Sequence, residues 1–267
     1  MLKEKTYRNL AGVPDFDAYE YGEKKNSAVL LIPVINEGER IRAELERAQA
    51  AEIGTLVDIV LCDGGSTDGS TEESLLRGLG VNTLLVKRGP GKQGAQLRNG
   101  FWWALERGYE GILTIDGNNK DSIEDVPRFL QKLAEGYDFV QGSRFVPGGE
   151  AVNTPLSRLL ALKLIHAPII SLTAHQRFTD TTSAYRAYSR RYLSDVRTQP
   201  FRDIFQAYEL LAYLSVRWAK LGMRACEVPV SRAYPKTGKT PTKISPIRGN
   251  WELLKTLFAN AFGKYNP

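Results

Sequence analysis

The stretch at residues 113–121, LTIDGNNKD, joins an apolar run to an acid, a glycine and a cluster of polar residues. This pattern predicts a buried strand that ends at Asp116. Ligands of open α/β sheets bind beyond the carboxyl ends of the strands, so Asp116 is expected at the mouth of a binding site. A carboxylate there can bind a divalent ion or a sugar hydroxyl. A second acid two positions later would complete a metal clamp, but the sequence has Asn118 there, followed by the cation Lys120.

Apolar runs alternate with helical patterns on both sides of this stretch. Strands are predicted at residues 28–33, 56–62, 81–87, 111–115, 138–142, 182–188 and 225–230. Helices are predicted at residues 37–51, 71–79, 94–108, 125–135 and 204–221. The short links between them favour a parallel sheet with right-handed crossovers. Residues 1–26 are weakly patterned and are expected to form an arm or a short element attached to the domain.

The composition is that of a globular protein. The chain has 267 residues, 42% of them hydrophobic, which suits one large α/β domain with a small appendage. Its formal net charge of +6 fits anionic partners such as nucleotides or phospholipids, and it fits an ordinary soluble protein equally well. Cys62 and Cys226 lack CxxC spacing and are expected to be buried thiols in a reducing compartment. His166 and His175 show no ligand spacing and are expected to be structural.

Two segments are of interest for membrane contact. The N-terminus lacks the apolar core of a signal peptide and no run of about 18 apolar residues occurs, so neither secretion nor a transmembrane helix is expected. Residues 155–173 are the most apolar segment but carry Arg158 and Lys163, which favours helices packed on the core or lying at a membrane surface. Residues 231–246 are basic and predict a mobile loop. The tail sets five apolar residues on one helical face, where core packing, a dimer face or membrane contact are alternatives: Ile247, Trp251, Leu254, Phe258 and Phe262.

Polar groups follow the first two predicted strands. Residues 33–37 read PVINE and residues 63–69 read DGGSTDG. Adjacent parallel strands that end in such groups build a crevice suited to a nucleoside, although Asn36 or Ser66 alone would more often be a helix cap. Gly89, Gly91 and Gly94 spell GxGxxG, but this motif follows the third strand and contains Pro90. A dinucleotide fold is therefore disfavoured, while a loop that approaches a phosphate remains open.

Eight motifs follow one another between about residues 28 and 230: PxxNE, DGGSTDGS, GPGKQGAQLRNG, TIDGNNKDSIEDVP, GSRF, DTTSAYR, FQAYEL and EVPV. In this order the chain resembles the family 2 glycosyltransferases of GT-A fold, and it is most similar to the dolichyl and polyprenyl phosphate sugar transferases. The resemblance implies a mostly parallel sheet flanked by helices in a domain at residues 1–230. That domain would have a nucleotide-binding half at about 28–144 and an acceptor-binding half at about 145–230, with a basic loop and an amphipathic helix following at 231–267.

The same resemblance implies an inverting transfer of a sugar from a nucleotide diphosphate sugar to a polyprenyl phosphate or a similar phosphate-bearing acceptor, usually assisted by Mg²⁺ or Mn²⁺. It assigns the donor to Pro33, Asn36, Glu37, Asp63, Gly65, Ser66, Asp68, Arg98, Asn99, Asp116, Gly117, Asn118 and Gln206. It assigns the acceptor phosphate to Arg144 and Arg158, whose planar guanidinium groups suit bidentate binding, with Lys239 in the basic loop. Asp180 is expected to face the acceptor oxygen, and Glu209 to lie beside the donor sugar.

The departures from the family pattern concern the metal. Asp116 and Asn118 occupy the metal-binding positions, and an amide oxygen ligates without charge. We expect Lys120 to supply positive charge to the donor diphosphate and to weaken or remove the dependence on metal; the alternative is a solvated Lys120. The protein is expected to be cytoplasmic, either free or peripheral at the inner face of a membrane, and not to bind nucleic acid. A homo-oligomer is left open. A glycan or soluble hydroxyl acceptor, and a non-catalytic sugar-nucleotide binder, remain alternatives.

Overall fold

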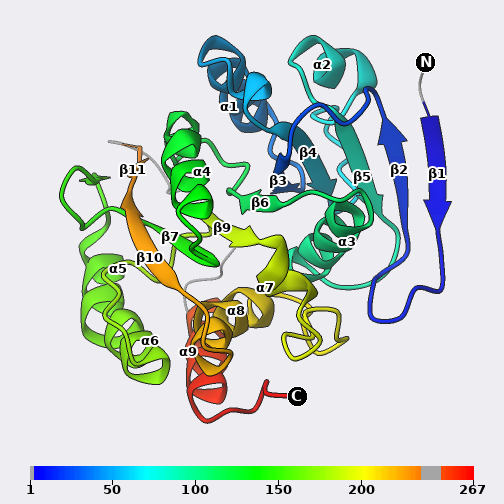
Figure 1. Ribbon diagram of the computed structural model, residues 1–267. Helices are drawn as coiled ribbons and strands as arrows, with labels where there is room; N and C mark the ends of the chain where they lie inside the picture. The colour runs from blue at the N-terminus through cyan, green and yellow to red at the C-terminus, as the bar shows by residue number, and fades with distance from the viewer. Residues whose placement is uncertain (1–2, 236–247) are drawn as a thin grey trace.

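The structure is a computed structural model that describes residues 3–235 and 248–267. One large sheet crosses the molecule in the order β1-β2-β5-β4-β3-β6-β9-β7-β10 (Figure 1). Its strands are β1 (Lys3–Tyr7), β2 (Phe16–Glu20), β3 (Ala28–Val34), β4 (Asp58–Asp63), β5 (Thr83–Lys87), β6 (Gly111–Thr114), β7 (Phe139–Ser143), β9 (Arg186–Ser189) and β10 (Ala225–Pro229). A small parallel pair is formed by β8 (Glu150–Val152) and β11 (Ser231–Ala233).

The sheet is mixed rather than wholly parallel. The central strands β5, β4, β3 and β6 are parallel to one another, as expected, and β7 and β10 are a parallel pair at the far edge. Between these groups β9 runs antiparallel to both β6 and β7. Since β9 alone is reversed there, the carboxyl ends of β3, β4, β6, β7 and β10 lie on one edge of the sheet.

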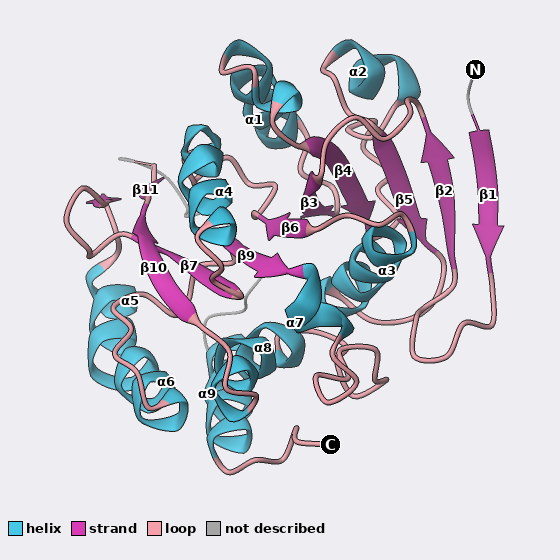
Figure 2. Ribbon diagram, viewed as in Figure 1, coloured by secondary structure: helices cyan, strands magenta, loops and turns pink. Residues whose placement is uncertain are grey.

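Helices cover both faces of the sheet, as Figure 2 shows. Alternate residues of β3 divide between the two cores: Leu30 and Ile32 pack with α1, α2 and α4, while Val29 and Leu31 pack with α3, α6 and α8. This alternation is what a central strand buried on both faces requires. The α-helices are α1 (Glu39–Ala50), α2 (Glu73–Gly78), α3 (Gln93–Glu106), α4 (Val126–Ala134), α5 (Leu156–Ala161), α6 (Ala167–Ala174), α7 (Arg190–Ser194), α8 (Glu209–Lys220) and α9 (Arg248–Ala261).

Of the two alternatives expected for the N-terminal segment, an arm or a short element, the structure has the second: two strands that join the edge of the sheet. Strand β2 pairs antiparallel with β5, and β1 pairs with β2 at the edge. Phe16 and Ala18 are fully buried, and the ring of Phe16 stacks on Tyr7 at 4.7 Å. Only these few apolar positions carry the strand pattern, which is why the sequence reads as weakly patterned.

The apolar segment at residues 155–173 forms a nearly continuous helical run, in which a π-helical turn (Leu162–His166) joins α5 to α6. Its inner side packs on the core through Ile170 and Ala174, whereas Leu164 and Leu172 are 70% and 75% exposed. By length and composition alone this run is the one described helix that could cross a membrane, which is weak evidence for a membrane span.

Helix α9 contacts α6 and α8 and contributes Leu257 to the core. The expected apolar face is turned outward rather than inward, because Trp251, Phe258 and Phe262 are all exposed. Ile247 lies outside the described residues, as does most of the basic loop. The face of α9 that packs inward also includes Asn260, whose amide donates to the carbonyl of Ala212 at 2.7 Å.

Candidate functional site

Side chains from several strands meet at the carboxyl edge of the sheet. Asn36 follows β3, Asp63 ends β4, Asp116 follows β6 and Arg144 follows β7. The parallel directions of these strands bring residues far apart in the sequence to one side of the molecule (Figure 1). This is the edge at which ligands bind in open α/β sheets.

The turns after β3 and β4 hold each other in place. The backbone N–H of Asn36 donates to Ser66 Oγ at 2.9 Å, and the N–H of Thr67 donates to Asn36 Oδ1 at 2.8 Å. Ser66 in turn donates to Asp63 through its N–H and its hydroxyl. The N–H of Gly38 donates to Asp68 Oδ2 at 2.9 Å. The structure thus brings together four of the predicted nucleoside-binding residues, and their role in binding stays a prediction.

Four other residues assigned to the donor are Pro33, Glu37, Gly65 and Gly117. Pro33 is half-buried within β3, and Glu37 forms an ion pair with Arg40 at 2.8 Å. Gly65 has a φ of 96°, a conformation that disfavours any side chain. Gly117 lies so close to β3 that a Cβ atom would approach Val34 Cγ1 to 2.7 Å. Gly117 therefore lets the turn after Asp116 pack directly on the sheet.

The glycine loop before α3 makes a close backbone contact with the segment that precedes α8. A Cβ atom on Gly94 would lie 2.6 Å from the carbonyl oxygen of Ala207, and the N–H of Lys92 donates to the carbonyl of Gln206 at 2.7 Å. This approach accounts for the glycine without a dinucleotide. It also fixes Gln93, which the sequence analysis missed and whose Nε2 donates to Asp116 Oδ1 at 3.0 Å.

Arg98 and Asn99 are buried in α3, each 1% exposed. Arg98 donates to the carbonyl of Gly12 at 2.7 Å and to Asp203 Oδ1 at 2.8 Å. Those bonds hold the guanidinium of Arg98 against the β1–β2 connection and Asp203, and its assignment to the diphosphate stays a prediction. Asn99 has both side-chain polar atoms buried without a hydrogen-bond partner, and nothing in the structure assigns it to a ligand.

Asp116 forms an ion pair with Arg232, which lies in β11 of the small two-stranded sheet. Arg232 in β11 is 7% exposed; its Nη2 lies 3.4 Å from Asp116 Oδ2, and its Nη1 donates to Asp121 Oδ2. One guanidinium therefore bridges two carboxylates. Sequence analysis had placed Arg232 at the start of a mobile loop, and its contact with Asp116 joins residues 116 positions apart.

The turn after Asp116 carries further buried charges. Lys120 is 7% exposed; burial lowers its pKa first, and the charge of Arg232 lowers it further. Burial raises the pKa of Asp121, while Arg232 opposes that rise. Beneath the turn, Glu44 of α1 accepts the N–H of Asn119 at 2.8 Å, and burial raises the pKa of Glu44 well above its ordinary value.

Cations surround the buried ring of Tyr234. Lys120 Nζ lies 5.4 Å, Arg158 Cζ 5.6 Å and Arg232 Cζ 5.8 Å from the ring centroid. Burial by itself would raise the pKa of Tyr234, but Arg232, Arg158 and Arg144 together bring it below its ordinary value. Tyr234 was not foreseen from the sequence. No motif marks it, and only the fold shows that cations from three separate segments meet there.

Arg144 and Asp180 form a buried ion pair, which corrects the expected role of Asp180. Arg144 donates from Nε to Asp180 Oδ2 at 2.6 Å and from Nη2 to Asp180 Oδ1 at 3.0 Å. Asp180 is 0% exposed, so its carboxylate cannot face an acceptor oxygen. A fork of this kind fixes the arginine instead. Asp180 is a positioning residue for Arg144.

Three other assignments lie at the border of the site. Glu209 begins α8, and its Oε2 accepts the N–H of Ala207 at 2.6 Å. Gln206 donates to the carbonyl of Asp203 at 2.6 Å, while its own Oε1 is buried without a hydrogen-bond partner. Burial raises the pKa of Tyr208, and the charges of Asp116, Glu252 and Glu209 raise it further. Lys239 lies outside the described residues.

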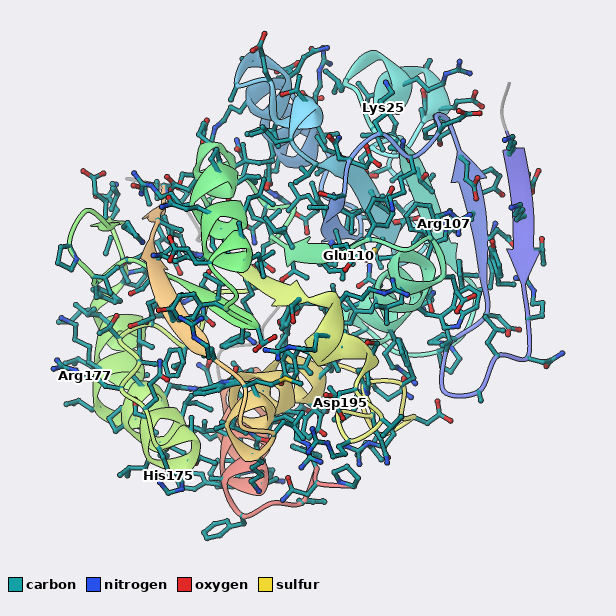
Figure 3. The ribbon with its side chains drawn as sticks, in the orientation of Figure 1. Lys25, Arg107, Glu110, His175, Arg177 and Asp195 are labelled. Carbon is teal, nitrogen blue, oxygen red and sulfur yellow. The ribbon has the colours of Figure 1, made fainter. Side chains whose placement is uncertain are left out.

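The cysteines and histidines take no part in this site. Both cysteines are free; Cys62 is buried and Cys226 half-buried. Burial lowers the pKa of His166 in the π-helical turn. His175 is exposed at the end of α6, at the margin of the molecule in Figure 3.

A divalent ion held by Asp116 and Asn118 does not fit these contacts. Both oxygens of Asp116 face a partner, Gln93 or Arg232. Asn118 offers a neutral amide oxygen, buried without a hydrogen-bond partner. Within residues 3–235 and 248–267 no group of three or more His, Cys, Asp or Glu side chains could hold a metal ion. An ion at Asp116 would first have to displace a guanidinium.

Comparisons with known proteins agree with the fold and the motifs. The chain is 31% identical over 214 residues to an undecaprenyl-phosphate mannosyltransferase of Micrococcus luteus, covering 79% of this chain and 85% of the relative. It is 28% identical over 226 residues to a polyprenol monophosphomannose synthase of Mycolicibacterium smegmatis, covering 82% of each.

Solved structures share the architecture. A glucosyl-3-phosphoglycerate synthase of Mycobacterium tuberculosis, in complex with Mn²⁺, UDP and phosphoglyceric acid, matches 88% of this chain and 78% of its own with a TM-score of 0.60 at 17% identity. A mannosyl-3-phosphoglycerate synthase of Rubrobacter xylanophilus covers 88% of this chain and 72% of its own with a TM-score of 0.59 at 15% identity. They confirm the expected GT-A-like fold. The profile of "Glycosyl transferase family 2" matches residues 29–197, and the chain belongs to this family of glycosyltransferases.

Proposed function

We propose that the protein transfers a sugar, with inversion, from a nucleotide diphosphate sugar to a polyprenyl phosphate. The observation that carries this proposal is the group of cations around Tyr234, defined by Lys120, Arg144, Arg158 and Arg232. Clustered cations of this kind bind phosphate groups, and guanidinium forks bind them with defined geometry. The relatives named for undecaprenyl phosphate and polyprenol support the lipid as acceptor.

The chemistry of a phosphate acceptor suits the groups present. Such an acceptor is already an anion, so its oxygen can attack the sugar carbon without a strong base. Asp180, the carboxylate expected to face the acceptor oxygen, is bonded to Arg144 instead. The main need is positive charge at the departing diphosphate and at the incoming phosphate, which preorganised cations supply. In this proposal Asn36, Asp63, Ser66 and Asp68 hold the nucleoside, and Glu209 with Gln206 lies beside the sugar.

The position of Arg158 links the cations to an apolar surface. Arg158 belongs to α5, in the same helical run as the exposed Leu164 and Leu172. Helix α9 packs beside α6 (Figure 1). Phe262, which directly follows α9, is 86% exposed. An apolar surface next to a phosphate site is what an acceptor with a long isoprenoid chain requires. We propose that these helices contact a membrane peripherally, with the lipid phosphate drawn towards Arg158.

Transfer assays with an Arg158→Ala variant test the acceptor. The purified protein is given a panel of radiolabelled UDP- and GDP-sugars with undecaprenyl phosphate in detergent, or with 3-phosphoglycerate as a soluble phosphate acceptor. Arg158→Ala should lower kcat/KM for the lipid about 10- to 100-fold, the cost of one charged hydrogen bond. Arg177→Ala is the matched control, because Arg177 is an exposed arginine that follows α6, at the margin of the molecule in Figure 3. Transfer only to the soluble acceptor would overturn the lipid proposal.

Liposome flotation tests the membrane contact separately. Leu164→Glu and Leu172→Glu should each reduce binding to phosphatidylglycerol vesicles, since a charge would enter the apolar layer. Leu56→Glu serves as the control, because Leu56 is an exposed leucine outside these helices. Equal binding by all three variants would show that the apolar faces serve another purpose.

A further inference from the structure

The pairing of Arg232 with Asp116 has a consequence for how the diphosphate is bound. The acid that the family pattern assigns to a metal faces a guanidinium from β11 at 3.4 Å, and the same guanidinium bonds to Asp121. Asp116 is the acid at the metal-binding position, and Asp121 is a second acid close to it in the same turn. The positive charge at this point of the site is therefore already part of the chain.

Backbone hydrogen bonds hold Arg232 in this position. The N–H of Ala233 donates to the carbonyl of Lys120 at 2.8 Å, and the N–H of Ser122 donates to the carbonyl of Ser231 at 2.9 Å. The N–H of Ser231 also donates to Ser122 Oγ at 3.0 Å. Residues on both sides of Arg232 are thus tied to the turn that carries the acids. The guanidinium is built into the site by the backbone rather than resting on it as a surface side chain.

The charges in the turn after Asp116 also argue against a bound divalent ion. Arg232 and Lys120 offer two positive charges within reach of Asp116 and Asp121. An arginine guanidinium stays protonated at any working pH, so Arg232 brings a full positive charge to Asp116 and Asp121. A divalent ion added to this group would meet two cations at close range. Coulomb repulsion disfavours that arrangement in a buried site.

We propose that Arg232 is the resident cation of the donor site, which neutralises the diphosphate together with Lys120 and excludes a divalent ion from Asp116. The proposal deepens the transferase function above and rests on it for the identity of the diphosphate. A planar guanidinium can hold two phosphate oxygens at once, whereas an ion would have to bridge them through Asp116. Nucleotide binding is then independent of metal in this chain.

Direct binding of Mn²⁺ tests the exclusion without any nucleotide. Free Mn²⁺ is measured by electron paramagnetic resonance in a titration of the wild-type protein and of Arg232→Met. The wild type should bind no Mn²⁺ below about 1 mM, while Arg232→Met should bind it at least about 10-fold more tightly, because Asp116 and Asp121 lose their counter-ion. The double variant Arg232→Met, Asp116→Asn should lose the gained site. Tight Mn²⁺ binding by the wild type overturns the proposal.

Calorimetry with UDP and GDP tests the resident charge. In the wild type, the Kd for each nucleotide should differ less than about 2-fold between EDTA and Mn²⁺. In Arg232→Met, nucleotide binding should weaken at least about 10-fold in EDTA and recover in part with Mn²⁺. Arg47→Met is the matched control, since Arg47 bonds to the carbonyl of Asp121 and not to either acid. If Arg232→Met does not fold, Arg232→Lys replaces it, and a wild-type Kd that depends on Mn²⁺ still overturns the proposal. If neither nucleotide binds under any condition, the transferase proposal fails, and the Mn²⁺ titration alone decides the exclusion.

Discussion

The two ends of the site carry different kinds of side chain. At the β3–β4 end, Asn36, Ser66, Asp63 and Asp68 are acids, amides and hydroxyls that bond to one another and to backbone N–H groups. At the β7–β11 end, arginines and a lysine surround Tyr234, and two of the arginines, Arg144 and Arg232, are held by buried carboxylates. The first end suits a neutral, hydrogen-bonding group such as a nucleoside, and the second suits phosphates. Each end can be altered separately.

The largest expected effect comes from breaking the buried ion pair at the cationic end. Asp180→Asn leaves the charge of Arg144 buried without its counter-ion, which should lower the free energy of unfolding by about 3 kcal/mol. Asp68→Asn, at the exposed β3–β4 end, keeps a side-chain acceptor for Gly38 and should cost clearly less. Urea unfolding followed by circular dichroism measures both. Equal losses would show that the two ends do not differ in how firmly their charges are fixed.

The second expected effect separates the ends by ligand. Asn36→Ala removes the acceptor for Thr67 and should weaken UDP and GDP binding about 10-fold while leaving inorganic pyrophosphate unchanged. Lys120→Ala should weaken all three ligands, because pyrophosphate and nucleotides share the phosphate end. Isothermal titration calorimetry gives each Kd.

The control for Asn36→Ala is Asn9→Ala. Asn9 has a φ of 59°, close to the 48° of Asn36, so both alanines enter the same strained backbone region. Asn9 lies in the connection between β1 and β2, and its N–H donates to Asp15 Oδ1, which is not among the residues assigned to the nucleoside. A loss of nucleotide binding in both variants would point to backbone strain. A loss of pyrophosphate binding in Asn36→Ala would contradict the division of the site.

The sequence foretold the first end of the site better than the second. The turn residues after β3 and β4 follow apolar strands at once, so pattern alone places Asn36 and Asp63 on one edge. Arg232 and Tyr234 lie after the last strand of the sheet, and only the fold brings them to Asp116. Asp180 was assigned wrongly because an acid facing an acceptor and an acid facing an arginine are the same letter in a sequence. The antiparallel direction of β9 could not be predicted either, because the direction in which a strand pairs leaves no local pattern in the sequence.

The smallest expected effect concerns Glu44, a buried acid that links the turn after β3 to the turn after Asp116. Glu44 lies in α1, which follows the β3 turn, and its Oε2 holds the N–H of Asn119 in the turn after Asp116. Burial raises its pKa in the folded state above the ordinary 4.5. The folded protein therefore binds the proton more tightly than the unfolded chain, so this contribution to stability is present below about pH 4.5 and is lost as pH rises through the folded pKa.

Glu44→Gln keeps an oxygen for Asn119 and removes the ionisation. Relative to wild type, the variant should gain thermal stability as pH rises from about 5 to about 8, because only the wild type must bury a carboxylate or carry its proton at a cost. Glu46→Gln is the control: it lies in the same helix but is exposed and bonds to Arg42, so its Tm difference from wild type should not follow this trend. Melting curves across that range measure both. If the stability advantage of Glu44→Gln grew towards low pH instead, Glu44 would be ionised in the folded protein and held by Arg47. Glu44 would then link the two turns through its charge.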